Sequence, residues 1–309
     1  MVGSIEAQVE KELVQRSFSG RGAEERLVRV NFACNQACDF CFVSTHLPTA
    51  PLDDVRRAIV EASADGKRVV LSGGEPVLNP KLVEYVRLAK EHAAGRWPVE
   101  LQTNAVLLDD RAKVDALVQA GLESAFVSLH GSRAEISDVV TGAPGTFART
   151  VVGVDNLVRA GVAVILNFVI CTANKDDLPS VVELIAARWP GVPLNISFVA
   201  PSTDVVPRER WLIPRYADAM PHLEEAFVRA RALSVPLTGF ESMCGLPLCL
   251  VPERLADFLD KEPILEGGDE GEFMRAPACE GCAIASRCWG VRRGYAEIHG
   301  TDELRTVKM

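Results

Sequence analysis

The sequence predicts an α/β fold in which six strand-then-helix units form a partial barrel, followed by a small cysteine-rich C-terminal domain. Short apolar segments alternate with amphipathic segments of helical length between residues 26 and 232, as is typical of a parallel sheet covered by helices. Beyond residue 232, proline, glycine and cysteine become frequent and the helical periodicity weakens. Because six units are fewer than the eight that close a barrel, we expect an open sheet.

The expected strands are short segments rich in Val, Ile, Leu and Phe, a composition that favours buried strands. They span residues 26–32, 68–71, 99–103, 124–129, 162–170 and 194–199. In parallel α/β folds the ligand-binding loops lie at the carboxyl ends of the strands. The residues that follow each strand are therefore the first candidates for a functional site.

The expected helices carry apolar residues at intervals of three and four, and several have boundary signals. Pro51 precedes the first helix, and Gly121 and Gly161 follow two others. The helices span residues 53–64, 80–92, 111–120, 146–160, 177–188 and 216–232. Together these elements predict an N-terminal extension over residues 1–25, the partial barrel over residues 26–235 and the cysteine-rich domain over residues 236–309.

Composition narrows the class of protein. Of the 309 residues, 48% are hydrophobic and 24% are charged, so the chain can form a substantial core, and the formal net charge is −9. An acidic balance disfavours a nucleic-acid partner held by a broad basic face. The sequence has no apolar segment long enough to span a bilayer and no basic-then-apolar leader. We therefore expect a soluble, cytoplasmic protein with no membrane partner.

The nine cysteines are the most informative residues. Their number is odd, and cytosolic thiols stay reduced, so disulfides do not explain them. They are clustered, which indicates metal binding, with Cys171 standing alone. The first group is Cys34, Cys38 and Cys41, and the second comprises five cysteines between Cys244 and Cys288.

Three cysteines within eight residues can place three thiolates on one [4Fe–4S] cluster. With no fourth cysteine nearby, one iron would remain open for a ligand that is not a protein side chain. The alternative is structural zinc, which normally takes four protein ligands. In that case His46 or a distant residue would be the fourth ligand.

The segment Gly73, Gly74, Glu75 and Pro76 follows the second expected strand. Its glycines would let the backbone approach a ligand closely, and its glutamate would supply a carboxylate at the rim, although an ordinary tight turn has the same composition. The cysteine spacing and this segment together resemble the radical S-adenosylmethionine (radical SAM) superfamily. The resemblance covers about residues 26–201. The fold implied is the radical SAM type of partial barrel.

The resemblance implies roles for further residues. In that family the open iron is chelated by the amino and carboxylate groups of S-adenosylmethionine (SAM), and the glycine-rich segment holds its amino end. Phe40 matches the aromatic residue near the adenine. Polar residues at later strand ends would line the cofactor cleft, and Ser128 among them would reach the ribose or carboxylate. The alternative role of these residues is to cap the strand ends. These residues are Thr103, Asn104, Ser128 and Asn167.

The second cysteine group resembles the truncated auxiliary-cluster domains, SPASM or twitch, of some radical SAM enzymes. A full SPASM domain has a further cysteine where this chain has Arg292. We expect one auxiliary [4Fe–4S] cluster, and a zinc-ribbon-like site is the alternative because four thiolates also bind zinc. The expected ligands are Cys249, Cys279, Cys282 and Cys288, with Cys244 as a substitute.

The resemblance implies an enzyme that reductively cleaves SAM to a 5′-deoxyadenosyl radical. This radical would abstract hydrogen from a peptide or small-metabolite substrate, and the electron would come from a low-potential donor of the flavodoxin or ferredoxin type. One alternative is a non-catalytic zinc or iron–sulfur scaffold or electron carrier. Another is a tRNA-modifying radical SAM enzyme, which the acidic charge disfavours.

Overall fold

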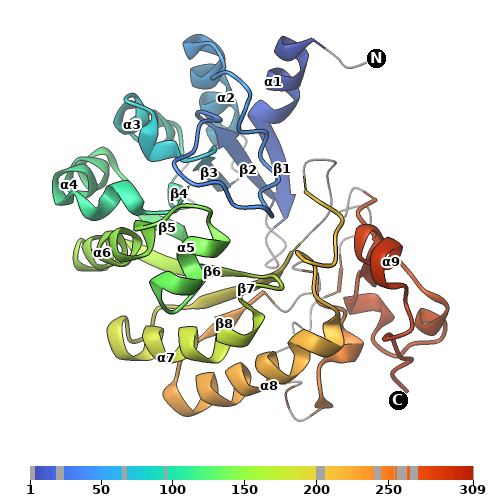
Figure 1. The fold of residues 1–309 in the computed structure, drawn as a ribbon. Coiled ribbons are helices and arrows are strands. Elements are labelled where there is room, and N and C mark those ends of the chain that lie inside the picture. Colours follow the sequence, from blue (N-terminus) through green and yellow to red (C-terminus); the bar gives the residue numbers. More distant parts are fainter. Residues whose placement is uncertain are drawn as a thin grey trace. The chain divides into compact units, whose positions relative to one another are not determined.

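The computed structural model describes residues 4–18, 24–64, 68–93, 95, 97–199, 206–239, 245–253, 255, 263–264 and 271–308. Within these residues lies a sheet of eight strands whose order in space follows the chain, from β1 to β8 (Figure 1). The strands are β1 Val14–Phe18, β2 Glu24–Arg29, β3 Arg68–Ser72, β4 Glu100–Thr103, β5 Ser124–Ser128, β6 Ala163–Ile170, β7 Leu194–Phe198 and β8 Leu237–Thr238. A separate two-stranded sheet pairs β9 Phe273–Met274 with β10 Val291–Arg292.

Helices alternate with the strands from β3 onward. Their ends show the expected signals: Asp110 accepts a hydrogen bond from the Ala112 N–H at 3.0 Å before α4, and Gly121, with φ 110°, ends that helix. The helices are α1 Ile5–Leu13, α2 Leu52–Ala64, α3 Leu82–His92, α4 Arg111–Ala120, α5 Ala134–Val140, α6 Thr146–Arg159, α7 Leu178–Arg188, α8 Tyr216–Leu233 and α9 Arg293–His299. None of the described helices is both long and apolar enough to cross a bilayer.

The α/β class is confirmed, and each of the six predicted strands and six predicted helices is present within a few residues of its expected bounds. Two strands of the eight-stranded sheet were not expected, nor was the β9–β10 pair. β1 pairs antiparallel with β2, and the two-residue β8 pairs parallel with β7. The sequence of β1 is largely polar, and a two-residue strand has no periodicity, so neither carries the apolar pattern by which the other strands are predicted.

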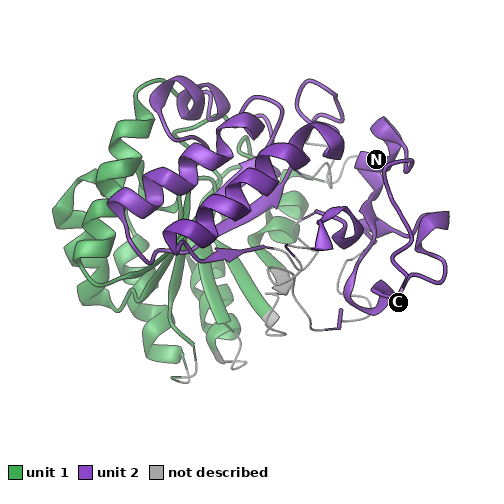
Figure 2. Ribbon diagram, turned by 90° about the horizontal axis from the view of Figure 1, so that it is seen from below, with its two compact units in different colours: residues 1–37, 43–129, 143–166 green, residues 38–42, 130–142, 167–309 purple. Residues whose placement is uncertain are grey.

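The chain forms two compact units (Figure 2). The first comprises Met1–Ala37, Val43–Leu129 and Ala143–Leu166, and the second comprises Cys38–Phe42, His130–Gly142 and Asn167–Met309. Strands β1 to β5 lie in the first unit, β7 and β8 lie in the second, and β6 contributes residues to both. Each unit is described by itself below.

In the first unit, the register of the parallel strands separates two kinds of surface. Val28 pairs with Leu71, and Leu71 pairs with Leu101, so these three fully buried residues share one face of the sheet. The other face carries polar residues near the carboxyl ends. There the Ser72 hydroxyl donates to the Gln102 side-chain oxygen at 3.0 Å. The carboxyl ends therefore present polar groups where parallel folds bind ligands.

Glu75 joins the ends of three strands. Its carboxylate is fully buried and accepts hydrogen bonds from the Thr103 hydroxyl and the Asn104 N–H, both at 2.7 Å, and from the Val77 N–H at 3.0 Å. Its own N–H donates to the carbonyl of Ala33 at 2.8 Å. The segment after β3 is thus bonded both to the end of β4 and to the chain just before Cys34.

Helix α6 packs closely against the segment that follows β4. A Cβ atom at Gly153 would lie 2.2 Å from the carbonyl oxygen of Ala105, so only glycine fits there. Ala105 itself has a φ of 58°, in the left-handed region. The Thr150 hydroxyl of the same helix donates to the Asn104 carbonyl at 2.9 Å. This contact fixes the turn that carries Asn104.

In the second unit, α7 and α8 pack together beside the end of β6 and strands β7 and β8. The C-terminal segment contributes a buried aromatic cluster in which the rings of Tyr216 and Tyr295 stack with centroids 3.9 Å apart. The Tyr295 hydroxyl accepts from the Tyr216 N–H at 2.9 Å, and the Tyr216 hydroxyl donates to the Gly245 carbonyl at 2.9 Å. These contacts attach α9 to α8.

Replacing Gly153 with alanine should lower the free energy of unfolding by about 1–3 kcal/mol, because the added Cβ meets backbone that cannot rotate away. Chemical denaturation measures this change. The matched control is Val152→Ala on the same helix, at a side chain that is 41% exposed and should cost far less. Equal stability of the two variants would contradict the close packing of α6.

Replacing Glu75 with glutamine should flatten the pH dependence of stability between about pH 4.5 and pH 6. Burial raises the pKa of Glu75 from 4.5 to about 6, so the folded state holds a proton that the unfolded state releases. The stabilisation is complete below pH 4.5 and is lost as the pH rises to 6, a change of about 2 kcal/mol.

The measurement is the free energy of unfolding at a series of pH values for the wild type and the variant. Glu91→Gln, at an exposed position of α3, is the control and should keep the wild-type slope. An unchanged slope in Glu75→Gln would show that this carboxyl does not titrate with a raised pKa.

Candidate functional site

Cys34 follows β2 in the first unit and is half-buried. The Gln36 N–H donates to its sulfur at 3.4 Å, and the Asn104 side-chain nitrogen lies 4.0 Å from the same sulfur. That nitrogen also donates to the Asn35 side-chain oxygen at 2.7 Å. Asn104, which was predicted from its position at a strand end, therefore lies beside the first cysteine. Its side-chain amide and the Gln36 N–H both point toward the Cys34 sulfur.

Cys38 and Cys41 belong to the second unit, and both are half-buried free thiols. The Cys41 N–H donates to the Cys38 carbonyl at 3.0 Å, which makes a tight turn with one cysteine at each end. Such a turn can present two thiols toward one ligand. With Cys34 four residues earlier in the chain, the donor set is three soft thiolates, which suits an iron–sulfur cluster with one open iron.

The glycines after β3 are required by their contacts with protein. A Cβ atom at Gly73 would lie 2.5 Å from the Asn31 carbonyl oxygen, and one at Gly74 would lie 2.3 Å from those of Phe32 and Ala33. Glu75 does not lie at the rim, as the sequence suggested, because its carboxylate is fully buried and bonded within the unit. The segment instead holds the chain immediately before Cys34.

The other predicted cofactor residues differ in what their side chains contact. The Thr103 hydroxyl is bonded to Glu75 and lies on the same face of the sheet as Leu101, two residues earlier in β4. Ser128 is half-buried at the end of β5. In the second unit, the Asn167 side-chain oxygen accepts from Asn195 at 2.9 Å and from Ser197 at 3.3 Å. Their cofactor roles stay predictions, as do those of Gly73 to Pro76.

Phe40 contacts a buried histidine in the second unit. Its ring meets that of His130 edge-on, with centroids 4.9 Å apart. Burial lowers the pKa of His130 to about 3, so the ring is neutral. Since the Val169 N–H donates to Nδ1 at 3.2 Å, the proton resides on Nε2. Phe40 thus rests on an uncharged ring whose orientation is fixed by the end of β6.

Cys171 is buried at the end of β6. Burial raises the pKa of its thiol to about 11, so it remains protonated at neutral pH. Its N–H donates to the Asn174 side chain at 2.8 Å. These features are those of a small apolar core residue.

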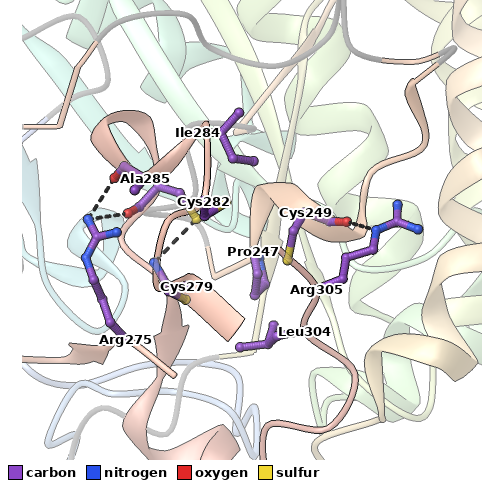
Figure 3. A pocket seen from close by; sticks show the side chains of 11 residues that line it. Pro247, Cys249, Arg275, Cys279, Cys282, Ile284, Ala285, Leu304 and Arg305 are labelled. Carbon is purple, nitrogen blue, oxygen red and sulfur yellow. Dashed lines mark hydrogen bonds between the residues drawn. The ribbon is translucent and has the colours of Figure 1, made fainter. Parts of the chain in front are cut away.

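Four of the tail cysteines line a single pocket in the second unit (Figure 3). The pocket has an empty volume of about 310 Å³, counting the part open to solvent, and its other walls include Pro247, Ile284 and Leu304. Its cysteines are the four that the sequence preferred as ligands: Cys249, Cys279, Cys282 and Cys288. Cys244, the predicted substitute, lies outside the described residues.

Two arginines hold the main chain of this pocket. The Arg305 Nε donates to the Cys249 carbonyl at 2.5 Å, and Arg275 donates to the carbonyls of Ala285 at 2.7 Å and Cys288 at 3.0 Å (Figure 3). Burial raises the pKa of the Cys249 thiol, and the three neighbouring cysteines raise it further. The four thiols are therefore close enough to interact, and both arginines line the same pocket.

Two kinds of metal site could use these four cysteines. One zinc ion needs its sulfurs about 2.3 Å from a common centre, whereas a four-iron cluster binds each thiolate at a different corner. Among the described residues there is no group of three or more His, Cys, Asp or Glu that could hold a metal ion. The metal of this pocket therefore stays a prediction.

Arg292, which replaces the further cysteine of a full SPASM domain, is buried. Its guanidinium pairs with Glu272 and lies over the Phe273 ring, 4.8 Å from the centroid. Arg292, buried and paired in this way, contributes to the packing of the tail. It leaves no thiol at this position for a second auxiliary cluster.

Sequence reasoning missed several residues around the two cysteine groups. Arg275 and Arg305 have no motif, since an arginine that bonds to a main-chain carbonyl needs no fixed spacing from its partner. Glu12 lies in the segment that was predicted as an N-terminal extension, and Arg29 of β2 bonds to it. An acidic residue on a helix before a strand ending in arginine is too common to signal a contact.

The chain matches the sequence model of the Radical SAM superfamily over residues 28–185, just over half of its 309 residues. The PqqA peptide cyclase of Ruegeria pomeroyi is 35% identical over 163 residues, which are 51% of this chain and 42% of that protein. The GTP 3',8-cyclase of Chlorobaculum tepidum is 33% identical over 180 residues, 56% of this chain and 53% of that protein. The match therefore spans about half the length of these curated relatives.

Solved structures share the fold at low sequence identity. Streptococcus suis SuiB bound to S-adenosylmethionine superposes with a TM-score of 0.61 at 15% identity, over 97% of this chain and 78% of SuiB. The enzyme anSMEcpe with bound AdoMet and the Cp18Cys peptide gives a TM-score of 0.59 at 14% identity, over 91% of each chain. These likenesses confirm the predicted partial-barrel fold. With the three-cysteine motif inside the matched half of its sequence, this chain belongs to the radical SAM superfamily.

Proposed function

We propose that this chain is an enzyme that reductively cleaves S-adenosylmethionine and starts its reaction by abstracting hydrogen from a peptide or small-metabolite substrate. The observation that carries the proposal is the spacing of Cys34, Cys38 and Cys41, directly after β2 and inside the segment that matches the family. Membership of the superfamily confirms two predicted cofactors, a [4Fe–4S] cluster and S-adenosylmethionine.

When bound, the reduced cluster and S-adenosylmethionine supply an electron and a sulfonium whose cleavage yields methionine and a 5′-deoxyadenosyl radical. The three cysteines would hold the cluster. The segment from Gly73 to Pro76 would keep the chain before Cys34 in place through the hydrogen bonds of Glu75. Phe40 would flank the adenine, and the neutral ring of His130, which contacts Phe40 edge-on, would hold it in position. An uncharged support keeps its geometry across the physiological pH range.

The substrate class follows from two kinds of support. The similar proteins include a peptide cyclase and a GTP cyclase, so both peptides and small metabolites are precedented among them. The chain also carries hydrogen-bonding side chains on adjacent strands: Asn167, Asn195, Ser197 and Thr238. Amide and hydroxyl groups can recognise either class without adding charge.

The reaction needs an electron at low potential, which we assign to a flavodoxin- or ferredoxin-type donor. We place the protein in the cytoplasm, where thiols stay reduced. We assign residues 26–235 to the partial barrel and residues 236–309 to an auxiliary-cluster domain, with residues 1–25 as an N-terminal extension.

For the tail we propose one auxiliary [4Fe–4S] cluster bound by Cys249, Cys279, Cys282 and Cys288. The pocket that these four cysteines line supports this assignment. A mononuclear zinc site is the alternative. Iron and sulfide analysis of anaerobically reconstituted protein separates the two, since two four-iron clusters give about eight irons per chain and one gives about four.

Replacing Cys38 with alanine should abolish formation of 5′-deoxyadenosine, because the cluster that binds S-adenosylmethionine loses one of its three thiolates. Replacing Cys282 with alanine should leave some of this activity, because it removes a ligand of the other metal site. The assay is anaerobic reduction in the presence of S-adenosylmethionine, with 5′-deoxyadenosine quantified by chromatography.

The matched control is Cys171→Ala, which removes a buried thiol that neither site uses and should keep both iron content and activity. Undiminished 5′-deoxyadenosine from Cys38→Ala would refute the assignment of the first site. Iron near four per chain in the wild type, together with bound zinc, would refute the auxiliary cluster.

A further inference from the structure

One carboxylate contacts both ends of the segment that carries the first cysteine group. Glu12 lies on α1 near the end of that helix. Along the chain, Arg29 ends β2 five residues before Cys34, and Ser44 follows Cys41 by three residues. Glu12 bonds to both Arg29 and Ser44, and all three residues belong to the first unit.

The contacts with Ser44 involve both carboxylate oxygens. The Ser44 hydroxyl donates to Oε1 at 2.6 Å, and the Ser44 N–H donates to Oε2 at 3.4 Å. Ser44 is buried, and its carbonyl accepts from the Leu47 N–H at 3.0 Å. The chain after Cys41 is therefore anchored at its first buried residue, by a side chain 32 residues earlier in the sequence.

The contacts with Arg29 hold the other end. Arg29 Nη1 donates to the Glu12 carbonyl at 2.7 Å and lies 3.4 Å from Glu12 Oε2, and Nη2 donates to Gln15 at 2.7 Å. The Arg29 side chain is 6% exposed and that of Glu12 is 24% exposed. Charge-assisted bonds at this depth are screened little by solvent, so they are stronger than those of a surface pair.

Glu12 lies outside the segment that matches the family's sequence model. The family match begins at residue 28, sixteen residues after Glu12. Both of its partners, by contrast, lie within the matched segment. A residue outside the matched segment therefore bonds to both ends of a loop inside it.

We propose that Glu12 is a positioning residue that closes the base of the cluster-binding loop, so that its cysteines are held ready for iron before the cluster forms. This inference rests on the proposed function of the three cysteines. Fixing Ser44 confines Cys41 to within about 10 Å of it along the chain. Bridging the two ends also removes loop-closure entropy that cluster binding would otherwise have to overcome.

The test uses full-length protein reconstituted with iron and sulfide without oxygen. Glu12→Gln removes the charge, Ser44→Ala removes the hydroxyl, and Glu10→Gln is the control at an exposed position of the same helix. The main measurement is the rate at which a ferrous chelator removes iron. The same measurement in a Cys282→Ala background assigns the released iron to the first site. A second measurement is the change in the EPR spectrum of the reduced cluster when S-adenosylmethionine is added.

Glu12→Gln and Ser44→Ala should each release iron from the first site about tenfold faster than Glu10→Gln, as expected for the loss of a buried charge-assisted hydrogen bond. The double variant should be little faster than either single variant, because both changes remove the same interaction. The EPR change with S-adenosylmethionine should weaken in both. If Glu12→Gln does not fold, Ser44→Ala decides the question without altering α1.

Release at the control rate in both variants would overturn the inference, as would equal acceleration of iron release from the tail site, which indicates general destabilisation. Failure of the proposed function gives a different result. In that case the wild type itself would bind no iron through Cys34, Cys38 and Cys41, and the Cys282→Ala background would contain none to release.

Discussion

The first unit depends on the buried carboxylate of Glu75. Glu75 bonds through its side chain to Thr103 and Asn104 at the end of β4, and through its main chain to the segment that precedes Cys34. Its burial is costly, as its raised pKa shows, and the cost is offset by three hydrogen bonds to the carboxylate. Through Asn104 the same network reaches the sulfur of Cys34. The ends of three strands are thereby fixed around one cysteine.

The two cysteine groups are held by different physical means. The first lies on a loop between elements of a sheet, and the residues that fix it are a buried carboxylate, two glycines without room for a side chain and an ion pair. The tail group lies among short turns, where Arg275 and Arg305 bond to main-chain carbonyls at the pocket. A sheet supplies rigidity through its ladder of hydrogen bonds, whereas a loop-rich tail depends on side-chain hydrogen bonds such as these.

The fold and the family could be predicted from the sequence because both leave strong local patterns: buried strands are apolar, and the three cysteines of this family recur at a fixed spacing. What the sequence could not reveal was the use of each polar side chain. Glu75 was expected at the rim, but the strand register places Thr103 where its hydroxyl bonds to that carboxylate. β1 was missed because its residues are mostly polar, and Glu12 because its partners are distant in the chain. Pairings of this kind depend on tertiary register rather than on local propensity.

The antiparallel pairing of β1 with β2 has a consequence for association between chains. Without β1, the outer side of β2 would expose a row of unpaired N–H and C=O groups next to the segment that leads to Cys34. Such an edge is a template on which another chain can add a strand. With β1 in place, five residue pairs from Val14–Val28 to Phe18–Glu24 occupy that side. β2, the strand nearest the first cysteine group, is thus shielded from intermolecular pairing, and the edge of the sheet passes to β1.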